Sequence, residues 1–143
     1  MIALGCDHGG FELMQMVKKH LEDKGVEYKD YGTYSTDSCD YPEFAKKVAE
    51  SILDGSAEKG ILICSTGIGI SIAANRYPGI RAGLCHDTMT ARLTREHNNA
   101  NILAMGAKCV GPELAKEIVD VFFETDFSGG ERHTRRVASI ERD

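Results

Sequence analysis

The chain has 143 residues, of which 42% are hydrophobic, and it carries a formal net charge of −5 at pH 7. This length is typical of one domain with a core large enough to fold unaided, and the acidic balance argues against nucleic acid as the main partner. No apolar run reaches the length of a membrane span, so we also expect no membrane partner.

The cysteines indicate a reducing environment. They are spread along the chain without a C-x-x-C pair, at Cys6, Cys39, Cys64, Cys85 and Cys109. An odd number of scattered cysteines is typical of free thiols in a cytosolic protein, and not of a disulfide framework or a zinc site. The first residues show no secretory signal pattern. We therefore expect a cytoplasmic protein without a bound metal.

The first half of the chain predicts two strands, each followed by a helix. The elements in order are a strand at 1–5, a helix from 11 that Gly25 ends, a strand at 26–31, and a helix that starts after Asp40 and ends at Gly55. Asp40 is a suitable N-cap, and Pro42 falls in the first turn of the second helix. We expect this helix to bury a face made of Phe44, Ala45, Val48, Ala49, Ile52 and Leu53.

The second half of the chain repeats the same alternation three times. Its elements are a strand from 60, a helix to about Arg76, a strand at 80–85, a helix to His97, a strand at 101–105, a helix from Pro112, and a basic tail at 131–143 that we expect to be helical. Five strands that alternate with helices imply a parallel sheet covered by helices on both faces. We therefore predict an α/β protein with a single domain over residues 1–143, a three-layer α/β/α sandwich around a five-stranded parallel sheet. The strand order does not follow from the sequence.

The central stretch at 60–71 combines a buried strand, a thiol and a glycine turn. Cys64 follows an apolar run, and Gly67 and Gly69 lie in the turn that leads to the next helix. Open α/β sheets bind ligands beyond the carboxyl ends of their strands, and N–H groups at a helix start favour negative charge. A cysteine beside such a turn can have its thiolate stabilised, which makes Cys64 a candidate base or nucleophile. A buried structural thiol is the alternative interpretation.

Other polar clusters follow the strands and helices. They are Asp7-His8 after the first strand, His86-Asp87 after the fourth, and His97-Asn98-Asn99 at a helix end. The carboxyl ends of parallel strands share one rim, so clusters that directly follow strands can converge there. Asp7 could also be a simple N-cap and His97 a common helix C-terminal residue, and we interpret the His86-Asp87 pair mainly as capping.

The basic tail suggests an anion site. Arg132 and Arg136 are four residues apart and share one helix face, and two guanidinium groups side by side suit a phosphate. Lys108, after the fifth strand, could add a third positive charge. A dinucleotide fingerprint is incomplete because Ile72 occupies the position of its third glycine, although Asp87 falls about where the ribose-binding acid is expected. This disfavours a nucleotide cofactor, and the combined pattern suits proton abstraction next to a carbonyl on a small phosphorylated substrate.

These motifs together resemble one known family. The segments that carry the resemblance are Gly5-Cys6-Asp7-His8, Asp40-Tyr41-Pro42, Cys64-Ser65-Thr66-Gly67-Ile68-Gly69, Ala73-Ala74-Asn75 and His97-Asn98-Asn99-Ala100-Asn101. The chain is similar, essentially from end to end, to the type B ribose-5-phosphate isomerases, a family shared with galactose-6-phosphate isomerase subunits. The resemblance implies a Rossmann-like fold and a cofactor-free aldose–ketose isomerase that interconverts ribose 5-phosphate and ribulose 5-phosphate through an enediolate. It also implies homodimers, often paired into tetramers, with each active site between two subunits.

The resemblance also implies a role for each matching residue. Cys64 matches the catalytic base, and Thr66 matches a hydroxyl that assists proton transfer between the substrate oxygens. His97 matches the residue that opens the furanose ring, with Asp7 at the ring oxygen. The implied substrate-binding residues are His8, Lys108, Arg132 and Arg136 at the phosphate, Tyr41 and Asn98 along the sugar, and Ser65, Gly67, Ile68, Gly69, Ile70 and Ser71 in the turn whose amides would stabilise the enediolate. No metal position is implied.

Three alternatives remain open from the sequence. The first is isomerisation of a related sugar, such as allose 6-phosphate, galactose 6-phosphate or a free aldohexose. The second is a non-catalytic module of flavodoxin-like shape that binds a nucleotide or a flavin. The third is a thiol hydrolase, which would need Cys64 paired directly with a histidine.

Overall fold

A computed structural model of the chain describes residues 1–141 and confirms the predicted α/β class. The elements in chain order are β1 (Ile2–Cys6), α1 (Phe11–Asp23), β2 (Tyr28–Asp30), α2 (Tyr41–Leu53), β3 (Lys59–Cys64), α3 (Ile68–Ala74), β4 (Ala82–Leu84), α4 (Thr88–Glu96), β5 (Ile102–Gly106), α5 (Pro112–Glu124) and α6 (Glu131–Ile140). The basic tail thus forms α6, and residues 142–143 of the expected helical tail lie outside the described residues.

The five strands form one parallel sheet with the order β2-β1-β3-β5-β4. The three inner strands, β1, β3 and β5, are apolar and buried almost throughout, as expected for a parallel sheet with helices on both faces. After β1 the chain moves outward to β2 and then returns across β1 to β3. The strand order therefore reverses between β1 and β3, and open α/β sheets bind their ligands in the crevice at such a point.

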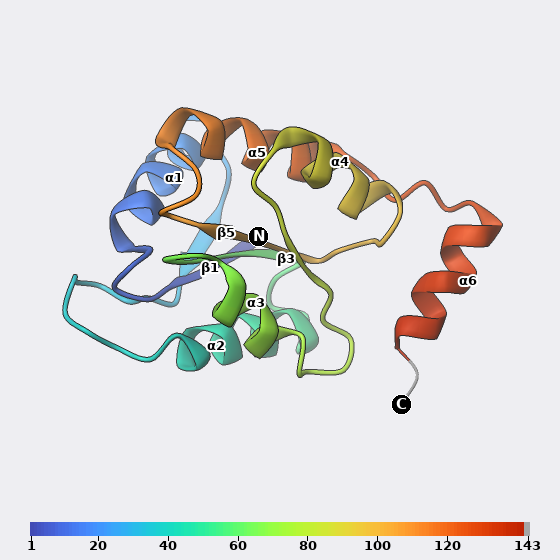
Figure 1. Ribbon diagram of the computed structural model, residues 1–143, viewed down its shortest axis with the longest axis horizontal. Coiled ribbons are helices and arrows are strands. Elements are labelled where there is room, and N and C mark those ends of the chain that lie inside the picture. Colours follow the sequence, from blue (N-terminus) through green and yellow to red (C-terminus); the bar gives the residue numbers. More distant parts are fainter. Residues whose placement is uncertain (142–143) are drawn as a thin grey trace.

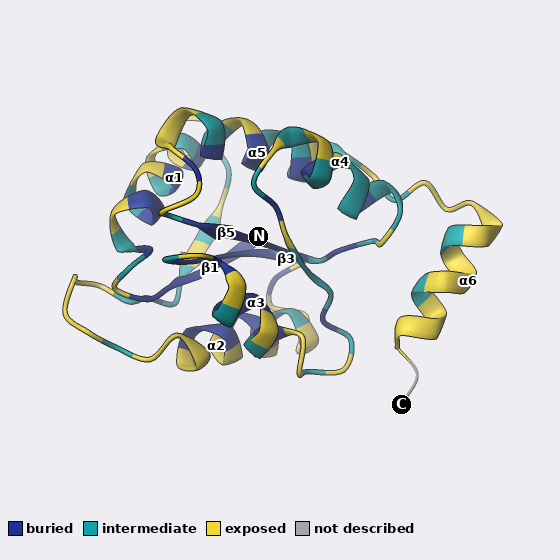
Figure 2. Cartoon of the chain, viewed as in Figure 1, coloured by how far each residue is buried: buried dark blue, intermediate teal, exposed yellow. Residues whose placement is uncertain are grey.

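Helices cover both faces of this sheet. Helices α1, α4 and α5 pack on one face and α2 and α3 on the other, as Figure 1 shows. The buried residues are concentrated in the strands and on the inward sides of these helices (Figure 2). Helix α6 stands apart from the three layers and contains no buried residue, so its position is set by contacts at its ends and along one side.

The face of α2 differs from the prediction at its last turn. Leu53, which we expected to be buried, is 48% exposed, whereas Ser51 is only 4% exposed. A helix turns about 100° per residue, so Leu53, nine positions after Phe44, projects from the opposite side, while Ser51 falls on the same side as Phe44. The Ser51 hydroxyl donates a hydrogen bond to the Val48 carbonyl oxygen at 2.7 Å, which satisfies the buried polar group.

The five cysteines are all free thiols. Burial raises the pKa of Cys6 to about 12 and that of Cys85 to about 11, so both remain protonated thiols at neutral pH. They are therefore structural side chains of the core. None of the helices within residues 1–141 has the length and apolar character that crossing a bilayer requires.

Candidate functional site

Cys64 lies at the carboxyl end of the central strand β3, as predicted. Its side chain is 5% exposed, and its Sγ accepts a hydrogen bond from the Gly67 amide at 3.1 Å. Gly67 has a φ of +77°, a left-handed conformation that costs side-chain-bearing residues about 1–2 kcal/mol. The glycine is thus needed for the bend that aims this amide at the sulfur. A charge-assisted bond of this type stabilises a sulfur that becomes negative.

The turn after Cys64 uses some of its amides internally and leaves others free. The Ile68 amide donates to Thr66 Oγ1 at 3.2 Å, and the Ser71 amide donates to the Gly67 carbonyl at 3.2 Å. The amides of Gly69 and Ile70 lie in the first turn of α3, where helices leave N–H groups unpaired, and they have no acceptor among residues 1–141. These two amides are therefore the ones open to an oxyanion.

Tyr41 lies beside the start of α3. A methyl group on Gly69 would be only 2.6 Å from Tyr41 Cζ, so this close approach of the ring requires the glycine. Tyr41 is 38% exposed and opens α2 directly after Asp40, which is the N-cap but makes no side-chain capping bond. The ring therefore forms one wall beside the turn, and its other side faces solvent.

Asp7 and His8 lie on the neighbouring strand end. The Asp7 amide donates to the Ile63 carbonyl at 3.3 Å, and Asp7 Oδ1 accepts from the Gly10 amide at 3.1 Å. His8 Nδ1 accepts from the Cys39 amide at 3.2 Å, which places the proton of a neutral ring on Nε2. The ring is exposed, so Nε2–H can donate to an anion beside the rim.

The loop after β5 completes this rim. The Ala107 amide donates to the Cys64 carbonyl and the Lys108 amide to the Ser65 carbonyl, both at 2.9 Å. The rim therefore brings together most of the predicted site residues: Asp7, His8, Tyr41, Cys64, Ser65, Thr66, Gly67, Ile68, Gly69, Ile70, Ser71 and Lys108. The predicted convergence of the strand ends is confirmed for the ends of β1, β3 and β5.

His86 and Asp87 follow β4 and act mainly as the sequence suggested. Asp87 caps α4, because its Oδ1 accepts from the Thr90 amide at 2.7 Å. This bond and one from the Thr90 hydroxyl lower the pKa of Asp87. His86 Nε2 is buried without a hydrogen-bond partner among the described residues.

The remaining predicted residues lie at the opposite end of the sheet, beside the amino-terminal ends of the strands, which we call the amino edge. Ile102 pairs with Gly60 and Gly106 with Cys64, so the turn at 97–101 is at the amino-terminal end of β3. Gly60 and Cys64 are four residues apart in β3, which corresponds to about 13 Å along the strand. His97 and Asn98, and with them Arg132 and Arg136 on α6, are therefore separated from Cys64 within one chain.

The residues at this amino edge form a second cluster. The His97 ring stacks on the His133 ring with a centroid distance of 4.4 Å and an interplanar angle of 7°. The pKa of His133 is lowered, first by desolvation and then by the nearby His97, Arg132 and Arg136. Its ring is therefore neutral at neutral pH. The arginines are exposed on α6 and available to an anion.

A buried arginine shapes the turn that carries His97. Arg95 is 5% exposed, and within residues 1–141 it donates only to neutral groups: the carbonyls of Thr125 and Ala100 at 3.0 and 2.7 Å, and Asn99 Oδ1 at 2.9 Å. Asn99 has a φ of +48°, a left-handed conformation that asparagine tolerates better than most residues. The guanidinium thus connects the 97–101 turn to the segment that leads into α6.

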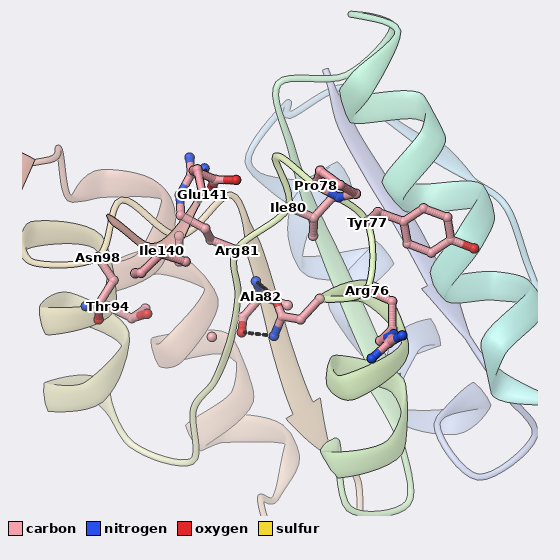
Figure 3. Close-up of a pocket in the computed structure, with 13 residues that line it drawn as sticks. Arg76, Tyr77, Pro78, Ile80, Arg81, Ala82, Thr94, Asn98, Ile140 and Glu141 are labelled. Carbon is pink, nitrogen blue, oxygen red and sulfur yellow. Dashed lines mark hydrogen bonds and ion pairs between the residues drawn. The ribbon is translucent and has the colours of Figure 1, made fainter. Parts of the chain in front are cut away.

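A cavity of about 540 Å³ lies at the same end of the sheet, and the residues that line it are drawn in Figure 3. It lies between the segment at 75–83, the end of α4 and the end of α6, and Asn98 and Ile140 are part of its wall. An ion pair between Arg81 and Glu141 closes one side. The volume falls within the range of small-molecule pockets, although the cavity does not contain Cys64.

The comparisons with known proteins agree with this architecture. The family described as Ribose/Galactose Isomerase matches residues 2–140. The chain belongs to this family. It is 50% identical over 139 residues to ribose-5-phosphate isomerase B of Escherichia coli, a match that covers 97% of this chain and 93% of that protein. It is also 43% identical over 130 residues to the D-erythrulose-4-phosphate isomerase of Pectobacterium atrosepticum, with 90% of this chain and 86% of that protein covered.

Solved structures of family members share the fold. The ribose 5-phosphate isomerase of Thermotoga maritima is 56% identical and superposes with a TM-score of 0.96, over 98% of this chain and 96% of that one. Ribose-5-phosphate isomerase B of Clostridium thermocellum is 49% identical, also with a TM-score of 0.96, over 98% of this chain and 94% of that one. The family resemblance that the motifs suggested is thereby confirmed.

Sequence reasoning did not find three of the side chains described above. Cys39 contacts His8 across 31 residues, with its Sγ 3.9 Å from Nδ1, and no local pattern indicates this contact. The buried position of Arg95 is equally hidden, because arginine is normally a surface residue. For His133 a signal was available, since it lies between the two arginines assigned to the phosphate.

Proposed function

We propose that this protein interconverts ribose 5-phosphate and ribulose 5-phosphate through a cis-enediolate, with Cys64 as the base. The observation that carries the proposal is the position of Cys64, at the end of the central strand beside an amide-lined turn, in a member of a sugar isomerase family. The relatives named as ribose-5-phosphate isomerases cover nearly the whole chain, which supports this choice of substrate.

The geometry of the rim fits the chemistry of this reaction. Cys64 would take the proton from C2 of the open-chain aldose and return it to C1, while the Thr66 hydroxyl assists transfer between O1 and O2. The negative charge that develops on the oxygens would be stabilised by the free amides of Gly69 and Ile70. Loss of one such donor in other enzymes costs about 10²–10³ in rate, so these amides carry a large share of the barrier reduction.

The second half of the site would come from a partner subunit. We infer a homodimer because His97, Asn98 and the two arginines lie at the opposite edge of the sheet from Cys64. Strand β4 is an edge strand, and exposed apolar side chains lie on α3, β4 and α4 nearby: Ile68, Ile72, Leu84 and Met89. A two-fold axis beside β4 and perpendicular to the strands would reverse the partner's strands and bring the amino ends of those strands beside the Cys64 rim.

In this dimer the substrate would be held at both ends. Arg132 and Arg136 of the partner subunit, with Lys108 and His8 at the rim, would bind the phosphate, and His97 of the partner subunit would open the furanose ring with help from Asp7. Phosphate binding remote from the reacting carbons supplies energy that positions C1 and C2 against Cys64. Pairing of dimers into tetramers is compatible with this arrangement. The five free cysteines support a reducing compartment such as the cytoplasm.

A related sugar phosphate is the second candidate substrate. It is favoured by the relative named D-erythrulose-4-phosphate isomerase, which is 43% identical to this chain. The point charge of Lys108 bears on the choice, because lysine holds a phosphate less directionally than arginine does. Substrate preference therefore has to be measured across four-, five- and six-carbon aldose phosphates.

The test is turnover in D₂O with a panel of these aldose phosphates and the corresponding free aldoses. We expect ribose 5-phosphate to be isomerised fastest and to acquire deuterium at the carbon that receives the proton. Cys64→Ala should lose nearly all turnover while it still binds substrate, whereas Cys109→Ala, at an exposed cysteine, should match the wild type. Wild-type turnover in Cys64→Ala would remove the proposed base, and faster turnover of another sugar would select the second candidate.

A further inference from the structure

We infer that His133 is a positioning residue, which holds the ring of His97 and couples it to the helix that carries the phosphate-binding arginines. The inference deepens the proposed function and rests on it, because ring opening is the step assigned to His97. Through this coupling, the phosphate-binding arginines and the ring-opening imidazole of His97 would move together, and both would enter the active site of the partner subunit.

The stack is the contact that orients His97. The backbone of His97 is fixed as the C-cap of α4, because its amide donates to the Leu93 carbonyl at 2.8 Å. Its imidazole nitrogens make no hydrogen bond within residues 1–141, so the plane of the ring depends on packing. The nearly parallel His133 ring at 4.4 Å supplies that packing from one side.

The helix that presents His133 is anchored to the same edge at both ends. In the segment just before it, the Ser128 amide and hydroxyl both donate to the Glu96 carbonyl, at 3.1 and 2.8 Å. At its end, Glu141 accepts from the Gly79 amide at 2.9 Å and pairs with Arg81. With α6 held at these two points, His133 is placed over His97 by the backbone.

In α6, the residues that face His97 and the residues proposed to bind phosphate lie on adjacent faces of the helix. His133 and Val137 are the half-buried residues of the helix and face the body of the protein, whereas Arg132 and Arg136 are exposed beside them. A ring at position 133 therefore moves with the arginines, which makes the orientation of His97 sensitive to phosphate binding. Because His133 is neutral at neutral pH, it stacks without adding charge to the phosphate site.

A further phosphate ligand is the competing role for His133, and the two roles predict different defects. A ligand would be needed for affinity, and a phenylalanine could not replace it. A positioning residue would be needed for ring opening, and a flat aromatic ring such as phenylalanine would largely replace it. The decisive quantity is thus the rate of ring opening, measured separately from isomerisation and from binding.

The experiment uses the full chain with Cys64→Ala, which blocks proton transfer at carbon and leaves ring opening intact. Exchange between the α and β anomers of ribose 5-phosphate, which passes through the open chain, is followed by ¹³C exchange NMR. The added variants are His133→Ala, His133→Phe and, as control on the exposed side of α6, Arg135→Ala. Affinity for ribose 5-phosphate is measured by calorimetry on the same samples.

We expect His133→Ala to slow catalysed exchange at least about tenfold, since small misplacements of catalytic groups cost this much or more. Affinity should change less than about twofold, and His133→Phe should recover most of the exchange. Exchange in His133→Ala equal to that in the control, no recovery with phenylalanine, or no catalysed exchange in the Cys64→Ala background would overturn the inference. Isomerase activity of the wild type is measured in parallel, and its absence would overturn the proposed function itself.

Discussion

Replacing Gly67 with alanine tests the idea that the turn is built around Cys64. The glycine has a φ of +77°, and an added Cβ would lie 2.5 Å from Leu84 Cδ1 and 2.7 Å from the carbonyl carbon of Met105. The leucine can move, but the Met105 backbone belongs to the buried strand β5 and cannot. The methyl group therefore has to displace the turn itself.

The size of the effect follows from comparison with Gly55, whose φ is +85° and whose Cβ would meet no atom within 4 Å. Alanine at either position carries the same left-handed penalty of about 1–2 kcal/mol and the same gain of about 0.4–1 kcal/mol from a stiffer unfolded chain. These contributions cancel in the difference. Gly67→Ala should therefore be less stable than Gly55→Ala by the overpacking cost alone, about 1–3 kcal/mol.

Urea denaturation of both variants measures this difference, and activity assays show its consequence. A chain of this size loses roughly 2–4 °C of melting temperature per kcal/mol, so thermal unfolding gives a second reading. Gly67→Ala should also lose at least about tenfold in kcat, because the amide that contacts Cys64 Sγ moves with the turn. Equal stability of the two variants, or full activity in Gly67→Ala, would refute the reasoning.

Three further changes test the binding residues and one helix cap. Arg136→Ala should raise KM for ribose 5-phosphate much more than it lowers kcat, while Arg135→Ala leaves both unchanged; an unaltered KM in the first variant would reject the phosphate clamp. Lys108→Arg should lower KM for ribose 5-phosphate, because the planar guanidinium of arginine binds phosphate with two directed hydrogen bonds. Steady-state kinetics with phosphorylated and free sugars will detect a change of KM in either direction. Asp87 has a lowered pKa because the Thr90 amide and hydroxyl donate to its carboxylate. Its contribution to stability is therefore present above the usual carboxyl pKa of about 4 and is lost as pH falls through the lowered pKa. The stability gap between wild type and Asp87→Asn should thus close as pH falls below about 4, which urea titrations at a series of pH values will measure.

The alternation of strands and helices could be predicted because each element has its own local signal. Gly25 and Gly55 end helices with positive φ values, and Pro112 opens one, as the sequence suggested. The strand order could not be predicted, since it depends on contacts between segments far apart in the chain. Strand β4 has only three residues, so the predicted strand at 80–85 was too long.

The site could be predicted in part, for a related reason. Strand ends share a rim by topology, so Asp7 and Cys64 could be brought together from the sequence alone. His97 follows a helix that runs back along the sheet, which places it at the far edge. No pattern in one chain reveals the proposed contact between this end of the sheet and the rim of a second subunit. The contact between Cys39 and His8 likewise depends on tertiary structure.

The lack of any buried residue in α6 separates two kinds of evolutionary change. A ten-residue helix without a buried side chain contributes little to the core, and alone in water it would be marginally stable. Under the proposed function, substitutions in α6 would therefore alter which sugar phosphate is bound at little cost to folding. The proposed base Cys64, by contrast, ends the buried strand β3, where few replacements are tolerated. Substrate preference could thus change in evolution through substitutions in α6, while the reaction itself stays the same.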